Sequence, residues 1–215
     1  MKKLVIFDLD GTLVNTIADL AYSVNIALHA KGFPMHDYDK FPYFVGNGIY
    51  KLIERALPED SRDSETIQSV KAVFLEHYMY HNTDKSTVYI GIQELLQALN
   101  EKGVCIAVAS NKVHVATVSM VRHFFPSVPF ACVFGQRDGV PTKPDPTIVY
   151  DILENVGVLT SETLYVGDSG VDMQTAHNAG ITAVGVTWGL RPASELKRYN
   201  ADIIINSPPE LLMYL

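Results

Sequence analysis

The stretch LVIFDLDGT (4–12) decides the fold. Its first four residues are apolar without alternation, which is typical of a strand buried on both faces of a parallel sheet. Asp8 and Asp10 follow at once, and in an extended segment they share a side while Leu9 turns into the core. Gly11 then permits a sharp turn. Because parallel sheets bind ligands at the carboxyl ends of their strands, two acids this close indicate a hard cation, and Mg²⁺ above all.

Outward from this strand, short apolar runs alternate with segments of helical period. We expect further strands at 104–109, 131–134, 163–166, 182–186 and 202–205, and helices at 92–102, 113–123, 146–156, 171–179 and 208–214. The alternation predicts an α/β fold, a doubly wound parallel sheet with helices on both faces. Residues 15–84 show helical periods and no strand, so we expect them to form a helical cap domain inserted after the first strand. Residues 1–14 and 85–215 would then form the core.

Other polar residues follow later strands of the expected sheet. Asp168 and Asp172 come after TLYV (163–166) and lie on one face if a helix begins there. Ser110 and Asn111 come after VCIAVA (104–109), and with the N–H groups of a helix opening at 112 they predict an anion cradle.

Lys143, in the proline-flanked loop VPTKPDP (140–146), would supply positive charge at the same edge. Four carboxylates, one Mg²⁺ and this one lysine carry a formal net charge of −1. A phosphate dianion could therefore bind only if one acid is protonated, or if the lysine and the N–H groups face the phosphate.

Composition and charge limit the classes of partner and the cellular location that we expect. The net charge of −7 and the lack of a basic stripe argue against a nucleic acid. The longest apolar runs have the length of strands, so no membrane span or export signal is expected. Two cysteines exclude a disulfide framework, and the cytoplasm is the expected location. The sequence leaves a monomer and a homodimer open.

Four motifs in order, FDLDGTLV (7–14), ASN (109–111), KPDP (143–146) and GDSGVD (167–172), resemble those of the haloacid dehalogenase superfamily of phosphohydrolases. The resemblance covers essentially the whole chain, and the helical insertion is similar to a C1-type cap. It implies a magnesium-dependent phosphatase that acts on a small phosphorylated metabolite. The resemblance implies that Asp8 is the nucleophile that forms an aspartyl-phosphate and that Asp10 is the general acid/base. It implies that phosphate is bound by Ser110, Asn111 and Lys143. It also implies that Mg²⁺ is held by Asp8, Asp168 and the backbone carbonyl of Asp10, with Asp172 and Thr12 behind these ligands.

Three further segments are similar to phosphoglycolate phosphatases within this superfamily: VGNGIYKLIERAL (45–57), GIQELLQALNEKG (91–103) and VGVTWG (184–189). They imply 2-phosphoglycolate as the substrate. Pyrophosphatases and nucleoside-monophosphate phosphatases share much of this pattern and stay open as alternatives. So do a sugar-phosphate mutase and a non-catalytic phospho-ligand sensor, although a sensor would not need both Asp8 and Asp10.

The expected cap contains candidates for substrate recognition. Gly46, Asn47 and Gly48 form either a flexible tip that brings a helix N-terminus to the substrate or an ordinary turn; the resemblance favours the tip. Lys51 and Arg55 are spaced i, i+4 on the following helix. They are either a solvated charged face or the groups that bind the substrate carboxylate.

Overall fold

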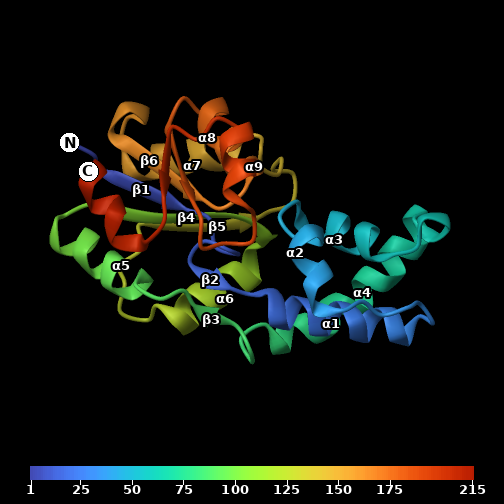
Figure 1. Ribbon diagram of the computed structural model, residues 1–215. Coiled ribbons are helices and arrows are strands. Elements are labelled where there is room, and N and C mark those ends of the chain that lie inside the picture. The colour runs from blue at the N-terminus through green and yellow to red at the C-terminus, as the bar shows by residue number, and fades with distance from the viewer. The chain divides into compact units, whose positions relative to one another are not determined.

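Six parallel strands form one sheet in the order β5-β4-β1-β6-β7-β8 in the computed structural model, which describes residues 1–215 (Figure 1). The strands are β1 (Leu4–Phe7), β4 (Cys105–Val113), β5 (Cys132–Gln136), β6 (Thr163–Gly167), β7 (Thr182–Val186) and β8 (Ile203–Ile205). This arrangement confirms the predicted doubly wound parallel sheet. Since β1 pairs with β4 on one side and β6 on the other, its carboxyl end lies between the carboxyl ends of these two strands, at the edge of the sheet where the ligand site is expected.

Helices cover both faces of this sheet (Figure 1). One face carries α5 (Ile92–Glu101), α6 (His114–Phe124) and the 3₁₀ helix η4 (Pro208–Tyr214), and the other carries α7 (Thr147–Val156), α8 (Gly170–Asn178) and α9 (Ala193–Arg198). Side chains of β1 alternate between the two cores: Val5 and Phe7 pack with the first group, Leu4 and Ile6 with the second. All four are fully buried, so an unbroken apolar run is what this position requires.

The structure corrects the expected boundary after the strand that carries the second motif. β4 continues to Val113, and α6 begins at His114 rather than at residue 112. The register shifts because Ala109 pairs with Phe134 and Val113 with Gln136, so β4 has two more residues here than β5. Such a bulge redirects side chains at the end of a strand. The N–H groups that open α6 therefore do not adjoin Ser110, and the expected helix-terminus cradle is wrong in that detail.

Other differences are local. The C-terminal helix expected at 208–214 is a 3₁₀ helix, and the short helix α9 was not expected. Two short strands, β2 (Val14–Asn15) and β3 (Thr87–Val88), form a separate two-stranded sheet that the sequence pattern also missed. Further 3₁₀ turns occur at η1 (Tyr38–Lys40), η2 (Glu59–Ser61) and η3 (Thr160–Glu162).

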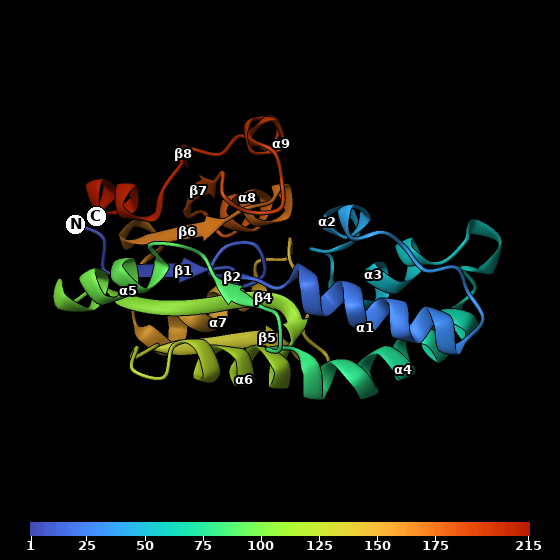
Figure 2. The same ribbon diagram turned by 60° about the horizontal axis from the view of Figure 1, so that its bottom comes forward.

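The chain divides into two compact units. The sheet unit comprises Met1–Asn15 and Val88–Leu215, and the helical unit comprises Thr16–Thr87. The helical unit contains α1 (Ile17–Ala30), α2 (Phe41–Phe44), α3 (Gly48–Ala56) and α4 (Ser64–His81), with α1 and α4 packed along one another (Figure 2). None of the helices combines the length and the apolar character that a membrane crossing requires.

Candidate active site

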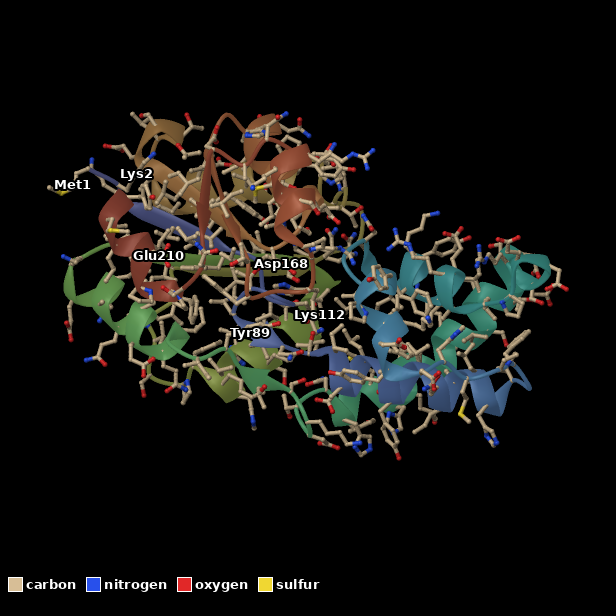
Figure 3. The ribbon with its side chains drawn as sticks, in the orientation of Figure 1. Met1, Lys2, Tyr89, Lys112, Asp168 and Glu210 are labelled. Carbon is tan, nitrogen blue, oxygen red and sulfur yellow. The ribbon has the colours of Figure 1, made fainter.

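The carboxyl ends of β1, β4 and β6 bring the predicted acids together. Phe7 lies opposite Val108 of β4 and Val166 of β6, and Asp8 follows directly. Carboxylate oxygens of Asp8, Asp168 and Asp172 lie within 4.8 Å of one another, and all three residues are buried. Figure 3 shows Asp168 at this edge of the sheet. Residues 160 positions apart in the chain thus form one acidic cluster.

Lys143 lies within this cluster. Its Nζ donates to Oδ1 of Asp8 and to Oδ1 of Asp172, both at 2.8 Å, and to the carbonyl oxygen of Ala109 at 3.0 Å. The side chain is 2% exposed. Asn111 holds its backbone: Oδ1 accepts from the N–H of Lys143 at 2.8 Å, and Nδ2 donates to its carbonyl oxygen at 3.1 Å. The lysine is therefore fixed from both its head and its backbone.

Burial and mutual charge perturb the ionisation of these groups. Burial raises the pKa of Asp8 to about 7, against the attraction of Lys143, and the Asp172 charge adds to the rise. Burial, with Asp172 and Asp8 nearby, raises the pKa of Asp168 well above its usual range. For Lys143, burial lowers the pKa, but the carboxylates of Asp172 and Asp8 outweigh it and raise the pKa well above the ordinary value. The cluster is thus short of positive charge.

Asp172 uses both oxygens within the chain. Oδ1 accepts from Lys143, while Oδ2 accepts from the N–H of Ser169 at 3.1 Å and from its hydroxyl at 2.5 Å. Ser169 in turn is the N-cap of α8, so the pair forms a capping box. With its oxygens engaged, Asp172 is suited to orient neighbours rather than to bind an ion directly.

Asp8 and Asp168, in contrast, each keep one oxygen without a donor. Oδ1 of Asp8 accepts from Lys143, and Oδ2 of Asp168 accepts from the N–H of Leu190 at 2.7 Å, but Oδ2 of Asp8 and Oδ1 of Asp168 accept no hydrogen bond from the chain. Gly11 lies against Asp168 with φ at +89°, where any Cβ would collide with that carboxylate. The carboxylate of Asp8 and the donor-free oxygen of Asp168 together offer oxygen ligands that fit a hard dication such as Mg²⁺.

Sequence reasoning missed Lys112. Its Nζ donates to both oxygens of Asp10, at 2.8 and 3.2 Å, and its side chain is 4% exposed. Asp8 and Asp10 are therefore held by different lysines, although both follow β1. The expected helix start at 112 concealed this residue, since a helix N-terminus gives a lysine no reason to point at the site. Counting Lys112 brings the formal sum of four acids, two lysines and one Mg²⁺ to zero.

Three more residues carry buried hydroxyl groups in this part of the sheet unit. The hydroxyl of Tyr165, on β6, lies 3.1 Å from Nζ of Lys143, and sequence reasoning missed it because an aromatic residue within a buried strand looks like core. The hydroxyl of Thr12 is buried and makes no hydrogen bond within the chain. Ser110, also buried, accepts from the N–H of Lys112 at 3.2 Å, so its own hydroxyl hydrogen points elsewhere.

In the helical unit, the structure separates the two basic candidates on α3. Lys51 pairs with Glu54 at 2.5 Å on an exposed surface. Arg55 instead donates to the carbonyl oxygen of Phe44 at 3.0 Å and to Oδ1 of Asn47 at 2.7 Å. Asn47 is the N-cap residue of α3, yet its side chain does not cap the helix. Arg55 thus stabilises the turn that contains Gly46, Asn47 and Gly48.

Comparison with known proteins agrees with this geometry. Residues 5–186 match the family model of haloacid dehalogenase-like hydrolases. The chain is 33% identical over 210 residues to a phosphoglycolate phosphatase of Agrobacterium fabrum, covering 96% of this chain and 89% of the relative. It is 34% identical to one of Mannheimia succiniciproducens, covering 98% and 96%.

The crystal structure of a protein from Lactobacillus delbrueckii subsp. bulgaricus, provisionally named phosphoglycolate phosphatase, superposes on this chain with a TM-score of 0.93 at 30% sequence identity. The superposition covers 98% of this chain and 97% of that one. The fold, the order of the motifs and the matched family model lead to one assignment: the chain is an enzyme that belongs to the haloacid dehalogenase-like hydrolases.

Proposed function

We propose that the protein is a magnesium-dependent phosphatase that hydrolyses 2-phosphoglycolate through an aspartyl-phosphate on Asp8. The observation that carries the proposal is the asymmetry of Asp8: Lys143 holds Oδ1, while Oδ2 has no donor from the chain. Similarity along the whole chain to phosphoglycolate phosphatases supports the class of phosphoric monoester hydrolase and this substrate.

The nucleophile is Oδ2 of Asp8, and its attack on phosphorus forms the acyl phosphate. Lys143 fixes the other oxygen, so the attacking atom keeps one direction. Asp10 protonates the departing alkoxide, and in the second step it takes a proton from the water that hydrolyses the acyl phosphate. The Ser110 hydroxyl donates to a phosphoryl oxygen, because its lone pair already accepts from the chain.

Asp8, Asp168 and the backbone carbonyl of Asp10 would hold Mg²⁺, with Asp172 and Thr12 behind them. When bound, the ion neutralises charge on the acids and on the phosphoryl oxygens. The donor-free Oδ1 of Asp168 supports this assignment. Asp172, whose oxygens are occupied, supports Lys143 and α8 instead.

For the helical unit we propose the role of a cap that binds the part of the substrate beyond its phosphate. Beyond its phosphate, 2-phosphoglycolate offers only a carboxylate. The turn at Gly46, Asn47 and Gly48 would bind it through backbone N–H groups and the amide of Asn47, with Arg55 holding that turn in place. Lys51 has its partner in Glu54 and remains the weaker candidate.

The test is a panel of phosphorylated metabolites assayed for phosphate release with Mg²⁺, with Asp8→Asn as the background control. Preferred release from 2-phosphoglycolate supports the proposal. Preference for pyrophosphate or a nucleoside monophosphate would replace the substrate but keep the mechanism. Transfer between sugar positions without free phosphate would indicate a mutase, and binding without turnover would indicate a sensor.

A further inference from the structure

We propose that Lys112 is a positioning residue for Asp10, and that it thereby controls protonation of the leaving group. The inference rests on the proposed phosphatase function. It concerns a residue outside the four motifs that the sequence singled out. Its ammonium lies 2.8 and 3.2 Å from the two oxygens of Asp10, across 102 positions of the chain.

The pair is buried enough to hold a defined geometry. The side chains of Lys112 and Asp10 are 4% and 14% exposed. A surface ion pair contributes little because water and salt screen it, but this pair is shielded and both carboxylate oxygens are engaged. Removing one partner would leave the other charge partly buried without compensation. Lys112 therefore helps to hold Asp10 in position.

The backbone of Lys112 is fixed as well. Its N–H donates to the hydroxyl oxygen of Ser110 at 3.2 Å, and its carbonyl oxygen accepts from the hydroxyl of Thr117 on α6 at 3.2 Å. These contacts lie in the bulged end of β4, where the extra residues redirect the side chains. One residue therefore connects the proposed phosphate-binding hydroxyl of Ser110 with the proposed proton donor Asp10. Its ammonium also supplies the charge that Lys143 alone does not.

A consequence follows for different leaving groups. An alkyl phosphate loses an alkoxide that must be protonated as it departs, so its hydrolysis requires a correctly placed Asp10. p-Nitrophenyl phosphate loses a stable phenolate that needs no proton. If Lys112 acts through Asp10, its loss should slow the first substrate far more than the second. If Lys112 only supports the fold or binds phosphate, both substrates should slow alike.

The experiment compares Lys112→Met, which keeps length and removes charge, with Lys112→Arg, which keeps a charge that can pair with a carboxylate. Lys102→Met, at an exposed lysine on the same unit, is the matched control. We expect Lys112→Met to lower kcat for 2-phosphoglycolate roughly a hundredfold, the scale of a general acid, with a change of less than about fivefold for p-nitrophenyl phosphate. Lys112→Arg should recover part of the alkyl-phosphate rate, and Lys102→Met should change neither.

The same comparison in the Asp10→Asn background measures the coupling between Lys112 and Asp10. There, adding Lys112→Met should leave the ratio of the two rates unchanged, because the group that Lys112 positions is gone. Equal losses for both substrates in the single variant, or a further change of the ratio in the double variant, would overturn the inference. Melting curves identify a variant that fails to fold, and Lys112→Arg then decides: an alkyl-phosphate rate that falls more than the p-nitrophenyl rate supports the role, and equal falls for the two substrates contradict it.

Failure of the proposed function gives a different result. If the wild-type protein hydrolyses another alkyl phosphate instead of 2-phosphoglycolate, the substrate assignment fails and the comparison is made with that ester. If the wild-type protein releases no phosphate from any ester, the proposed function fails, and the role of Lys112 fails with it.

Discussion

At the scale of single residues, Asp8 has a different task for each carboxylate oxygen. Asp8→Asn preserves shape but removes the anionic nucleophile, so we expect kcat to fall by at least about 10³-fold. Lys143 keeps its contact with Asp172, which favours a folded variant. Phosphate release under saturating substrate measures the effect, and the melting temperature serves as the control. Wild-type turnover in a pure Asp8→Asn preparation would contradict the mechanism.

The raised pKa values at the same site predict how pH affects metal binding. The pKa of Asp8 is about 7 without an ion, and that of Asp168 is well above normal, both mainly because of burial. Each must lose its proton before Mg²⁺ binds, so binding releases protons and is weakened by acid. We expect the Mg²⁺ affinity to rise at least about tenfold from pH 6 to pH 8. Calorimetric titration in buffers of different ionisation enthalpy measures both the affinity and the released protons.

Two aspartates provide the control for that titration. Asp168→Asn should nearly abolish Mg²⁺ binding, because a donor-free oxygen loses its charge, whereas Asp172→Asn should weaken it less. An affinity independent of pH, or equal losses in the two variants, would contradict the assignment of ligands.

At the scale of elements, the beginning of α3 carries a prediction about specificity. Arg55 holds Phe44 and Asn47, while Lys51 pairs with a neighbour on the surface. We expect Arg55→Ala to lower kcat/KM for 2-phosphoglycolate about ten- to a hundredfold, the value of a charge-assisted hydrogen bond. The rate with p-nitrophenyl phosphate, which lacks the carboxylate, should change little. Lys51→Ala is the matched control on the same helix, and a selective loss in that variant instead would reverse the assignment.

At the scale of the whole molecule, a buried carboxylate joins the beginning of the helical unit to its end. Asp19 on α1 accepts from the N–H of Lys85 at 3.0 Å, from the N–H of Ser86 at 2.8 Å and from the Ser86 hydroxyl at 2.6 Å. These bonds tie the end of the unit to its beginning, just before β3. Asp19→Ala leaves the N–H groups of Lys85 and Ser86 unpaired, whereas the Ser86 hydroxyl can still donate to the carbonyl oxygen of Asn82. It should lower the free energy of unfolding by about 1–3 kcal/mol. Chemical denaturation measures it, with exposed Asp37→Ala as the control, which should stay within about 0.5 kcal/mol of wild type.

The sequence by itself determined the strands of the six-stranded sheet and the edge at which the acids meet. An unbroken apolar run such as residues 4–7 has one stable environment, a strand covered on both faces, and parallel strands present their carboxyl ends together. Asp8, Asp168 and Lys143 could therefore be assigned to one site before any coordinates. Local period and topology are properties that a sequence displays directly.

Only the tertiary structure decided which partners the side chains choose. The bulge in β4 turns Lys112 to Asp10, and the packing of β6 brings the Tyr165 hydroxyl to Lys143. Both contacts join segments far apart in the chain. They depend on side-chain directions that a change of one residue in register would reverse. In the same way, Lys51 and Arg55 are equal candidates in the sequence, and only the fold of the turn before α3 gives Arg55 a partner in that turn while Lys51 pairs with Glu54.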